Sequence, residues 1–453
     1  MFDRHSVKAV LTEYFPLLSI LIGIGLISIS LGPFQNPDTQ LEYRAASGVL
    51  RWGMPYMTSV GNMINQPPIG FYIDALFFGV FGLSFDVGVA IITLFGLGCT
   101  FLVYQLGKFW YGKTVGVFAA AIFALTPWQF ALSRIFLIDT QCLFFSLLFL
   151  LAGMYAISND SFKLFMASGI LFAVAFLTKF FAVFTLIPLG LFYLYHRQKN
   201  LRHVAVVGAY FVPALILFFL WYQIVSGRGL SSAFVHDDFS NFNALGIVPS
   251  VFFIGDFLWD ALGIIVLVVA IVAVVVGVFG RKIFANTLRF DLICLSTIIT
   301  VGCINFFMAI GLNLVAPYFN PIKYDYQFLP FVCLLAASLT SKSYWLVASV
   351  KSKSKLTKVL FLAAFVGLAL LAVAFYYNMS FVNEYSTWDH WIFKVDNISY
   401  LGYSFVNLNP IGEDSFLMGV QNLGYVLVYL GLTWATAWAG REKLGWLANK
   451  VTH

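Results

Sequence analysis

Four charged residues of this chain stand where long apolar stretches begin or end: Asp38, Arg134, Asp139 and Lys179. A carboxylate within hydrogen-bond reach can take a proton from a reacting group. Lysine and arginine side chains can bind an anion. Because ionisable side chains beside a bilayer are costly, they mark functional sites. The four positions therefore predict a catalytic surface on the membrane, and Asp38 is the most informative of them.

The polar stretch that opens at Asn36-Pro37-Asp38 is the only sizeable one in the first half of the chain, and it ends at Gln66-Pro67-Pro68. Asn-Pro-Asp is also a good turn and N-cap sequence, so Asp38 can simply begin a helix from Thr39 to Arg51. The capping and catalytic roles can coexist. Gly53 and the two prolines are interpreted as architectural, because they let the loop turn and lie on the bilayer.

The composition is that of a polytopic membrane protein. Of the 453 residues, 61% are hydrophobic and 10% are charged, against about 25% charged in soluble domains. The aromatic share of 18% suits the aromatic belts at the two membrane interfaces. We expect an all-α bundle of about 12 (roughly 11–13) transmembrane helices and no large soluble domain.

The basic residues and the cysteines exclude other classes of function. The net charge of +6 is spread between the apolar stretches without a continuous patch, so no nucleic-acid partner is expected. The five cysteines have no CxxC spacing and are interpreted as packing residues, neither disulfides nor metal ligands. They are Cys99, Cys142, Cys294, Cys303 and Cys333.

The apolar stretches place the spans, since about 20 apolar residues cross a bilayer. Two stretches are too long for one helix and are expected to fold back, around Arg134–Asp139 and around Thr178-Lys179. The whole chain, 1–453, is treated as one transmembrane domain. Its predicted spans are 15–31, 85–107, 114–131, 138–157, 164–178, 180–195, 204–225, 257–279, 291–313, 326–341, 358–377 and 417–438. Its expected outer loops are 32–84, which contains juxtamembrane helices, 226–256 and 378–415.

The lysines and arginines orient these spans. If the segment Pro67–Gly82 lies in the interface instead of crossing, most of the 26 basic residues fall on one side, which the positive-inside rule makes cytoplasmic. We therefore expect a multi-pass protein of a cell membrane or an ER-type membrane, with an uncleaved first span at 15–31 and both termini cytoplasmic. The positions that then share the extracytoplasmic face are Asp38, Glu42, Arg134, Asp139, Lys179, Lys323 and Asp325.

The order and spacing of several motifs resemble the polyprenyl-phosphate-sugar-dependent glycosyltransferases of the GT-C superfamily. The closest likeness is to the protein O-mannosyltransferase and lipid A aminoarabinose transferase group. The matching positions are Asp38, Gly53, Gln66-Pro67-Pro68, Arg134…Asp139 and Thr178-Lys179-Phe180, with a weaker echo in Tyr326-Gln327-Phe328-Leu329-Pro330. The chain departs from the family at three of these motifs: Thr39 replaces a second acid, Gln66 a lysine and Phe180 a glycine. We expect no counterpart of the family's large soluble C-terminal domain in this chain.

This resemblance implies an enzyme that moves a sugar from a polyprenyl (dolichyl or undecaprenyl) phosphate to an acceptor hydroxyl on the extracytoplasmic face. It implies a single displacement with inversion, with Asp38 as general base and Lys179 and Arg134 at the donor phosphate. The expected partners are the lipid-linked donor, membrane lipids and a protein, lipid or glycan acceptor. No cofactor and no divalent metal are expected. The supporting residues are Asp139, Glu42, Tyr43 and Gln66.

Further residues of the expected outer loops are candidate contacts for the sugar or the acceptor. The run His236-Asp237-Asp238 invites a metal site, but adjacent residues rarely converge on one ion, so a polar loop is favoured. Trp388 can stack on a sugar, although paired tryptophans also anchor loops at the interface. The candidates are His236, Asp237, Tyr324, Tyr326 and Trp388.

Each of these interpretations has an alternative. Lys179 can be a lysine that snorkels from a helix end. Arg134 and Asp139 can lie in a solvated turn, since residues five apart do not share a helix face. The whole chain can instead be a secondary transporter or a noncatalytic lipid-binding subunit. A transporter would place ionisable or helix-breaking residues near the bilayer midplane in two related halves, and neither feature is evident in the sequence.

Overall fold

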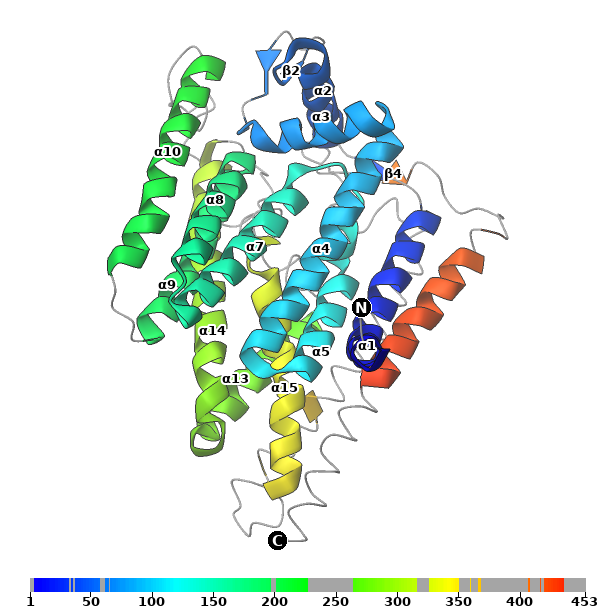
Figure 1. Cartoon of the computed structure of the whole chain (residues 1–453), viewed down its shortest axis with the longest axis vertical. Coiled ribbons are helices and arrows are strands. Elements are labelled where there is room, and N and C mark those ends of the chain that lie inside the picture. The colour runs from blue at the N-terminus through cyan, green and yellow to red at the C-terminus, as the bar shows by residue number, and fades with distance from the viewer. Residues whose placement is uncertain are drawn as a thin grey trace.

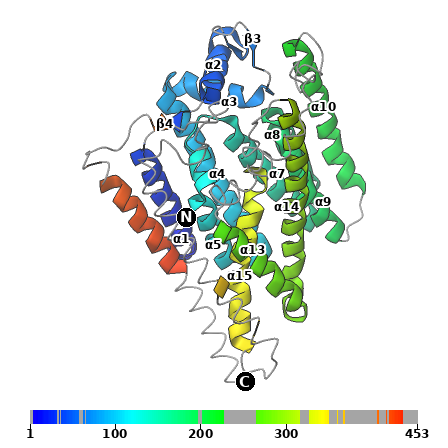
Figure 2. The same ribbon diagram turned by 180° about the vertical axis from the view of Figure 1, so that it is seen from behind.

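The computed structural model is a bundle of long helices that run side by side (Figure 1 and Figure 2). It describes residues 4–31, 34–35, 37–57, 62–64, 66–196, 201–226, 264–315, 326–349, 359, 366–367, 406–407, 416 and 419–435. Within these residues the strands are only two residues long each. The all-α class predicted from the composition is confirmed.

The helices of the bundle correspond in place to the predicted spans. By length and apolar composition, α4, α7 and the part Thr287–Ile304 of α14 can each cross a membrane, and shorter apolar helices accompany them. The predicted span 358–377 lies almost wholly outside the described residues. The bounds are α1 (Arg4–Leu31), α4 (Phe85–Tyr111), α5 (Lys113–Leu125), α7 (Ile138–Asn159), α8 (Phe162–Thr178), α9 (Leu186–Tyr195), α10 (Leu201–Ser226), α13 (Ile264–Phe279), α14 (Arg281–Val315), α15 (Leu329–Ser349) and a helix at 419–435.

The helix α7 lies at the centre of the bundle, where α4 and α8 both pack along it. It is largely buried, from Ile138 at its start to Ile157 near its end, although Tyr155 on one face is exposed. Gly153 allows α9 to approach closely, because a Cβ there would lie 2.9 Å from a methyl carbon of Leu189. The surrounding helices thus fix the position of the first turn of α7, which carries Asp139.

Two breaks in the apolar stretches turn the chain at one end of the bundle. The predicted continuous span 114–131 is wrong, because α5 ends at Leu125 and a short helix, α6 (Pro127–Leu132), follows. Pro127 explains the break, since a proline lacks an N–H and forces the residue before it out of helical geometry. The second break is at Lys179, an extended residue between α8 and the 3-10 helix η1 (Phe180–Thr185). Both predicted reversals of direction are confirmed.

Short elements cover that end of the bundle, and we call α2 and α3 the cap. In Figure 1, α3 lies across the direction of α4, as expected of a juxtamembrane segment. The strand β1 pairs antiparallel with β4, which brings residues of the expected outer loops 32–84 and 378–415 together; β2 pairs with β3. The bounds are α2 (Pro37–Trp52), α3 (Ile69–Phe81), β1 (Phe34–Gln35), β2 (Tyr56–Met57), β3 (Asn62–Met63) and β4 (Val406–Asn407).

A buried ion pair joins α14 and α15. The side chains of Asp291 and Lys342 are both fully buried, with Lys342 Nζ 2.7 Å from Asp291 Oδ2. Lys342 also donates to the backbone oxygen of Ala273 in α13 at 2.8 Å. Tyr111, the last residue of α4, donates to Asp291 Oδ1 at 3.1 Å. The pair therefore links four helices of the bundle.

The helix at 419–435, red in Figure 1, lies beside α1. Two glycines meet where the helices touch: a Cβ at Gly23 would lie 2.5 Å from the carbonyl oxygen of Gly424, and a Cβ at Gly424 would lie 2.7 Å from that of Gly23. Small residues let the backbones of membrane helices approach in this way. The packing of the last described helix therefore depends on having no side chain at these two positions.

Replacing Gly424 with alanine is expected to lower the free energy of unfolding by about 1–3 kcal/mol, because the new methyl group meets backbone atoms that cannot rotate away. Thermal unfolding of the purified protein in detergent measures this effect. The matched control is Gly419→Ala in the same helix, where a Cβ would meet nothing within 4 Å. Equal unfolding temperatures for the two variants would contradict the close contact.

Candidate active site

The first turn of α7 forms the floor of the candidate site. The chain leaves α6, turns, and starts α7 at Ile138. The hydroxyl of Thr140 donates to the backbone oxygen of Leu132 at 3.0 Å and closes this turn. A carboxylate in the first turn of a helix interacts favourably with the helix dipole. The position of Asp139 is therefore set both by the turn and by the buried helix that follows.

An ion pair joins this turn to the break after α8. Lys179 Nζ lies 2.6 Å from Asp139 Oδ2, and the two side chains are only 6% and 5% exposed. Removing two charges from water is costly, so a pair this buried depends on its close contact. The alternative in which Lys179 is a snorkelling lysine is wrong, because its ammonium group is inside the protein. Asp139 is the partner of Lys179, a pairing that the sequence analysis did not predict.

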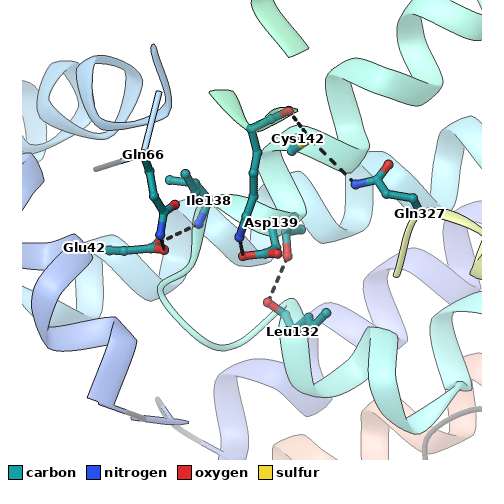
Figure 3. A network of polar contacts seen from close by, with 9 residues as sticks. Glu42, Gln66, Leu132, Ile138, Asp139, Cys142 and Gln327 are labelled. Atoms are coloured by element: carbon teal, nitrogen blue, oxygen red, sulfur yellow. Dashed lines mark hydrogen bonds and ion pairs between the residues drawn. The ribbon is translucent and has the colours of Figure 1, made fainter. Parts of the chain in front are cut away.

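A thiol and an amide lie beside this ion pair (Figure 3). Cys142 donates to the backbone oxygen of Lys179 at 3.4 Å, and the amide nitrogen of Gln327 lies 3.7 Å from the sulfur of Cys142. Gln327 comes from the segment just before α15, far along the chain. Its side chain is nearly fully buried. The segment 326–330, which carries the weaker resemblance to the family, therefore lies beside the ion pair.

Glu42 connects the cap to the same turn. Its Oε2 accepts the backbone N–H of Ile138 at 2.8 Å, and its Oε1 accepts a hydrogen bond from the side-chain amide of Gln66 at 3.3 Å. The indole N–H of Trp221 in α10 donates to the backbone oxygen of Gln66 at 2.7 Å. Figure 3 shows Glu42, Gln66 and Ile138 side by side. The predicted supporting role of Gln66 and Glu42 thus has a geometric basis.

Asp38 lies in the first turn of α2, which begins at Pro37. It therefore follows the start of the helix, whereas the capping alternative places the helix start at Thr39. Glu42, one turn further along α2, contacts the backbone at the start of α7.

Arg134 is fully buried in the turn between α6 and α7. Its guanidinium carbon lies 5.3 Å from the centre of the Phe130 ring, a cation–π distance. The alternative of a solvated turn is wrong, since Arg134 and Asp139 are both inside the protein. The ion pair is made by Asp139 and Lys179, so Arg134 adds a second cation to the same end of the bundle.

Tyr43 holds the cap by aromatic packing. Its ring makes edge contacts with Phe78 of α3 at 5.5 Å and with Phe136, just before α7, at 6.1 Å between ring centres. Burial raises the pKa of the Tyr43 phenol above its ordinary value, although the nearby charge of Arg51 opposes this. The phenol is therefore neutral at physiological pH and can serve as a hydrogen-bond donor.

The remaining sequence candidates are only partly described. Tyr326 is fully buried, and its hydroxyl donates to Gln129, so no surface of it is open to a sugar in this structure. The residues that lie outside the described part are His236, Asp237, Tyr324, Trp388, Lys323 and Asp325. Among the described residues, no group of three or more His, Cys, Asp or Glu side chains is placed to hold a metal ion.

Sequence reasoning missed the contacts made by main-chain atoms and by neutral side chains. The contribution of the Ile138 backbone N–H could not be predicted, because every residue except proline has such a donor. Gln141 and Asp74 form a buried hydrogen bond next to the ion pair, and neither was considered. An acid within the apolar run 69–81 was the one signal that could have drawn attention to Asp74.

Residues 65–222 match the family described as dolichyl-phosphate-mannose-protein mannosyltransferase. The chain is 29% identical over 140 residues to a Bacillus subtilis (strain 168) protein with the provisional name mannosyltransferase YycA, which covers 31% of this chain and 20% of YycA. It is 30% identical over 159 residues to a second protein of that organism, with the provisional name mannosyltransferase YkcB, over 34% of this chain and 22% of YkcB. The chain thus spans about a fifth of the length of these curated relatives.

The fold is similar to that of ArnT from Cupriavidus metallidurans, solved bound to undecaprenyl phosphate. The TM-score is 0.51 at 14% identity, covering 92% of this chain and 75% of ArnT. At this identity the likeness concerns the fold alone. The family match adds a sequence relationship for the segment that carries Gln66, Arg134, Asp139 and Lys179. The likeness of the fold and the matched segment agree with the resemblance seen in the motifs.

Proposed function

We propose that the protein transfers a sugar from a polyprenyl phosphate to an acceptor hydroxyl on the extracytoplasmic face of the membrane. The donor class is supported by the relatives, which include proteins named as mannosyltransferases and an ArnT structure with bound undecaprenyl phosphate. The acceptor is a hydroxyl group of a protein, lipid or glycan. In this proposal both termini of the chain are cytoplasmic, and the cap covers the outer end of the bundle.

One observation carries the proposal: Glu42 accepts the N–H of Ile138. This contact brings the first turn of α2, with Asp38, to the first turn of α7, with Asp139. Asp139 in turn pairs with Lys179 across the break after α8. A carboxylate and a lysine from segments far apart in the chain are thereby gathered at one end of the bundle. A general base and a phosphate ligand need this kind of arrangement.

Lys179 and Arg134 are proposed to bind the donor phosphate. Breaking the bond between the anomeric carbon and the phosphate oxygen leaves negative charge on the phosphate. A cation that is already fixed stabilises this charge more in the transition state than in the bound donor, which is the condition for catalysis. The contact with Asp139 keeps the Lys179 ammonium oriented before the donor arrives.

Asp38 is proposed to act as the general base. The acceptor hydroxyl loses its proton as its oxygen attacks the anomeric carbon, and the carboxylate of Asp38 takes that proton. The polyprenyl phosphate leaves with the bonding electrons from the opposite side of the sugar. One displacement at the anomeric carbon inverts its configuration, so a β-linked donor gives an α-linked product.

The position of the charged groups favours this proposal over a secondary transporter. Glu42, Asp139 and Lys179 meet at the end of the bundle that the cap covers. A transporter site is expected near the middle of the membrane, between broken helices of two related halves. The polar contacts here instead join a membrane-spanning bundle to a juxtamembrane cap, which suits a lipid donor whose phosphate lies at the interface.

The test is a transfer assay with the purified full chain in lipid nanodiscs. Polyprenyl phosphates that carry radiolabelled mannose, glucose or arabinose are each supplied with short acceptor peptides, glycans or lipids. We expect time-dependent release of free polyprenyl phosphate from one donor and inverted configuration in the product. Retained configuration would contradict the single displacement. Donor binding without turnover under all conditions would favour a noncatalytic lipid-binding subunit.

A further inference from the structure

Asp74 is a buried acid in the middle of α3. Its side chain has no exposed surface, and its Oδ1 accepts a hydrogen bond from the amide nitrogen of Gln141 at 2.5 Å. Gln141 belongs to the first turn of α7, two residues after Asp139. The contact therefore joins the cap directly to the helix turn that holds the ion pair, and nothing in the proposed transfer reaction uses it.

The side-chain oxygens that take no part in this hydrogen bond are the informative feature. Asp74 Oδ2 and Gln141 Oε1 are both buried, and within the described residues neither has a hydrogen-bond partner. An ionised carboxylate with a single neutral donor would be a poorly compensated buried charge. A protonated carboxyl group has an O–H, and a carboxylic acid and an amide have complementary donor and acceptor pairs. A single proton on Asp74 Oδ2 would therefore give both of these oxygens a hydrogen-bond partner.

The backbone of α3 also presses on the residues next to the ion pair. A Cβ at Gly70, one turn before Asp74, would lie 2.8 Å from a methyl carbon of Ile138 and 3.1 Å from the methyl carbon of Thr178. Ile138 directly precedes Asp139, and Thr178 directly precedes Lys179. A small shift of α3 would therefore move both partners of the ion pair.

We propose that Asp74 is held as a neutral carboxylic acid that makes a two-point hydrogen bond with Gln141, with its O–H donating to Gln141 Oε1. This acid–amide pair fixes α3 against α7 and so sets the spacing of Asp139 and Lys179. Asp74 and Gln141 are positioning residues, since they act through the ion pair and touch no reacting atom. The readouts of donor binding and sugar transfer rest on the proposed function, whereas the spectroscopic readout does not.

The surroundings of Asp74 favour the neutral form. Burial raises the pKa of the Asp74 carboxyl well above its ordinary value, and the hydrogen bond from Gln141 opposes this only in part. No charged side chain is among the causes of this shift for the described part of the chain. Burial is therefore the larger of the two effects, and it favours the neutral acid.

The first experiment tests directly whether the Asp74 carboxyl group carries a proton. Infrared difference spectra of the full chain in nanodiscs at neutral pH compare the natural protein with Asp74→Asn. We expect a C=O band of a protonated carboxylic acid in the natural protein, which disappears in the variant and is unchanged in Asp160→Asn. A carboxylate band lost in its place would overturn the inference. This readout needs no substrate, so it stands even if the transfer reaction is not the one proposed.

The second experiment asks whether the pair positions the site. Asparagine reproduces the protonated acid, because its N–H donates to Gln141 Oε1 and its oxygen accepts from the Gln141 amide. Asp74→Asn is therefore expected to keep the unfolding temperature, the affinity for polyprenyl phosphate and the transfer rate. Asp74→Leu is expected to lower transfer by about 10²-fold, the effect of misplacing a site by about 1 Å. Equal loss in both variants would show that the charge of Asp74 is what matters.

A matched pair of glycine variants tests the same spacing with Asp74 itself unchanged. Gly70→Ala is expected to weaken binding of polyprenyl phosphate, because the new methyl group displaces Ile138 and Thr178 and also lies 3.2 Å from Gln141 Oε1. Gly79→Ala lies in the same helix, where a Cβ would be in ordinary contact, 3.6 Å from Leu50, and it is expected to bind like the natural protein. Equal affinities of the two variants would overturn the positioning role of α3.

Discussion

Replacing Asp38 with asparagine is expected to lower sugar transfer by about 10²–10⁴-fold, the usual contribution of a general base. Asparagine has the shape of aspartate but cannot take up the proton of the acceptor hydroxyl. The unfolding temperature and the affinity for polyprenyl phosphate are expected to stay unchanged, because the substitution keeps the size and shape of the side chain. Steady-state transfer with the labelled donor, together with a binding titration, measures both quantities.

The matched control for this substitution is Asp160→Asn. Asp160 is an exposed residue that ends α7, with a left-handed backbone at φ 48°, and asparagine adopts that conformation readily. The control removes one negative charge in the same way, and full transfer activity is expected. If Asp38→Asn also transfers sugar at the natural rate, Asp38 is not the base. A loss of donor binding equal to the loss of rate would assign Asp38 to the donor instead.

The fold was accessible from the sequence because apolar stretches of membrane length carry a strong signal. The spans and the two reversals of direction follow from length and from a few charged or turn-forming residues. The error at 114–131 shows the limit of that signal, since hydropathy continues through Thr126 while Pro127 breaks the helix. Local backbone chemistry, which hydropathy averages away, decides such boundaries.

The candidate site was only partly accessible. The residue types of Asp139 and Lys179 and their place at the ends of apolar stretches were visible in the sequence. Their pairing was not, because it depends on how α7 and α8 pack, and the two residues are separated by 40 positions in the chain. The same holds for Asp291 and Lys342, whose pairing depends on how α14 and α15 pack. Burial is a property of the packed bundle, and a charged residue at a helix end gives no sign of it.

The second large effect is expected at the ion pair. Replacing Lys179 alone with methionine leaves the Asp139 carboxylate buried without its cation, and this is expected to lower the free energy of unfolding by about 3–5 kcal/mol. Donor binding and transfer are expected to disappear as well. Loss of activity in this single variant is ambiguous, because a destabilised bundle and a missing phosphate ligand have the same result. Thermal unfolding in detergent measures the first contribution separately.

The double variant Lys179→Met with Asp139→Leu separates the two contributions. Apolar side chains that replace a buried ion pair are often neutral or stabilising, so the unfolding temperature is expected to return close to that of the natural protein. Affinity for polyprenyl phosphate is expected to stay lost, because the cation is still missing. Restored stability with restored transfer would mean that the pair is purely structural and that Lys179 does not bind the donor.

The pair Asp291 and Lys342 supplies the control for that experiment within the same chain. It is similarly close, at 2.7 Å, and fully buried, but it belongs to α14 and α15, and within the described residues none of its hydrogen bonds is to a residue of the candidate site. Asp291→Leu with Lys342→Met is expected to keep donor binding and transfer whenever the protein folds. If both double variants lose donor binding alike, buried ion pairs serve the stability of the bundle in general. If only the Lys179 variant loses it, the cation next to Asp139 is the one that the donor phosphate requires.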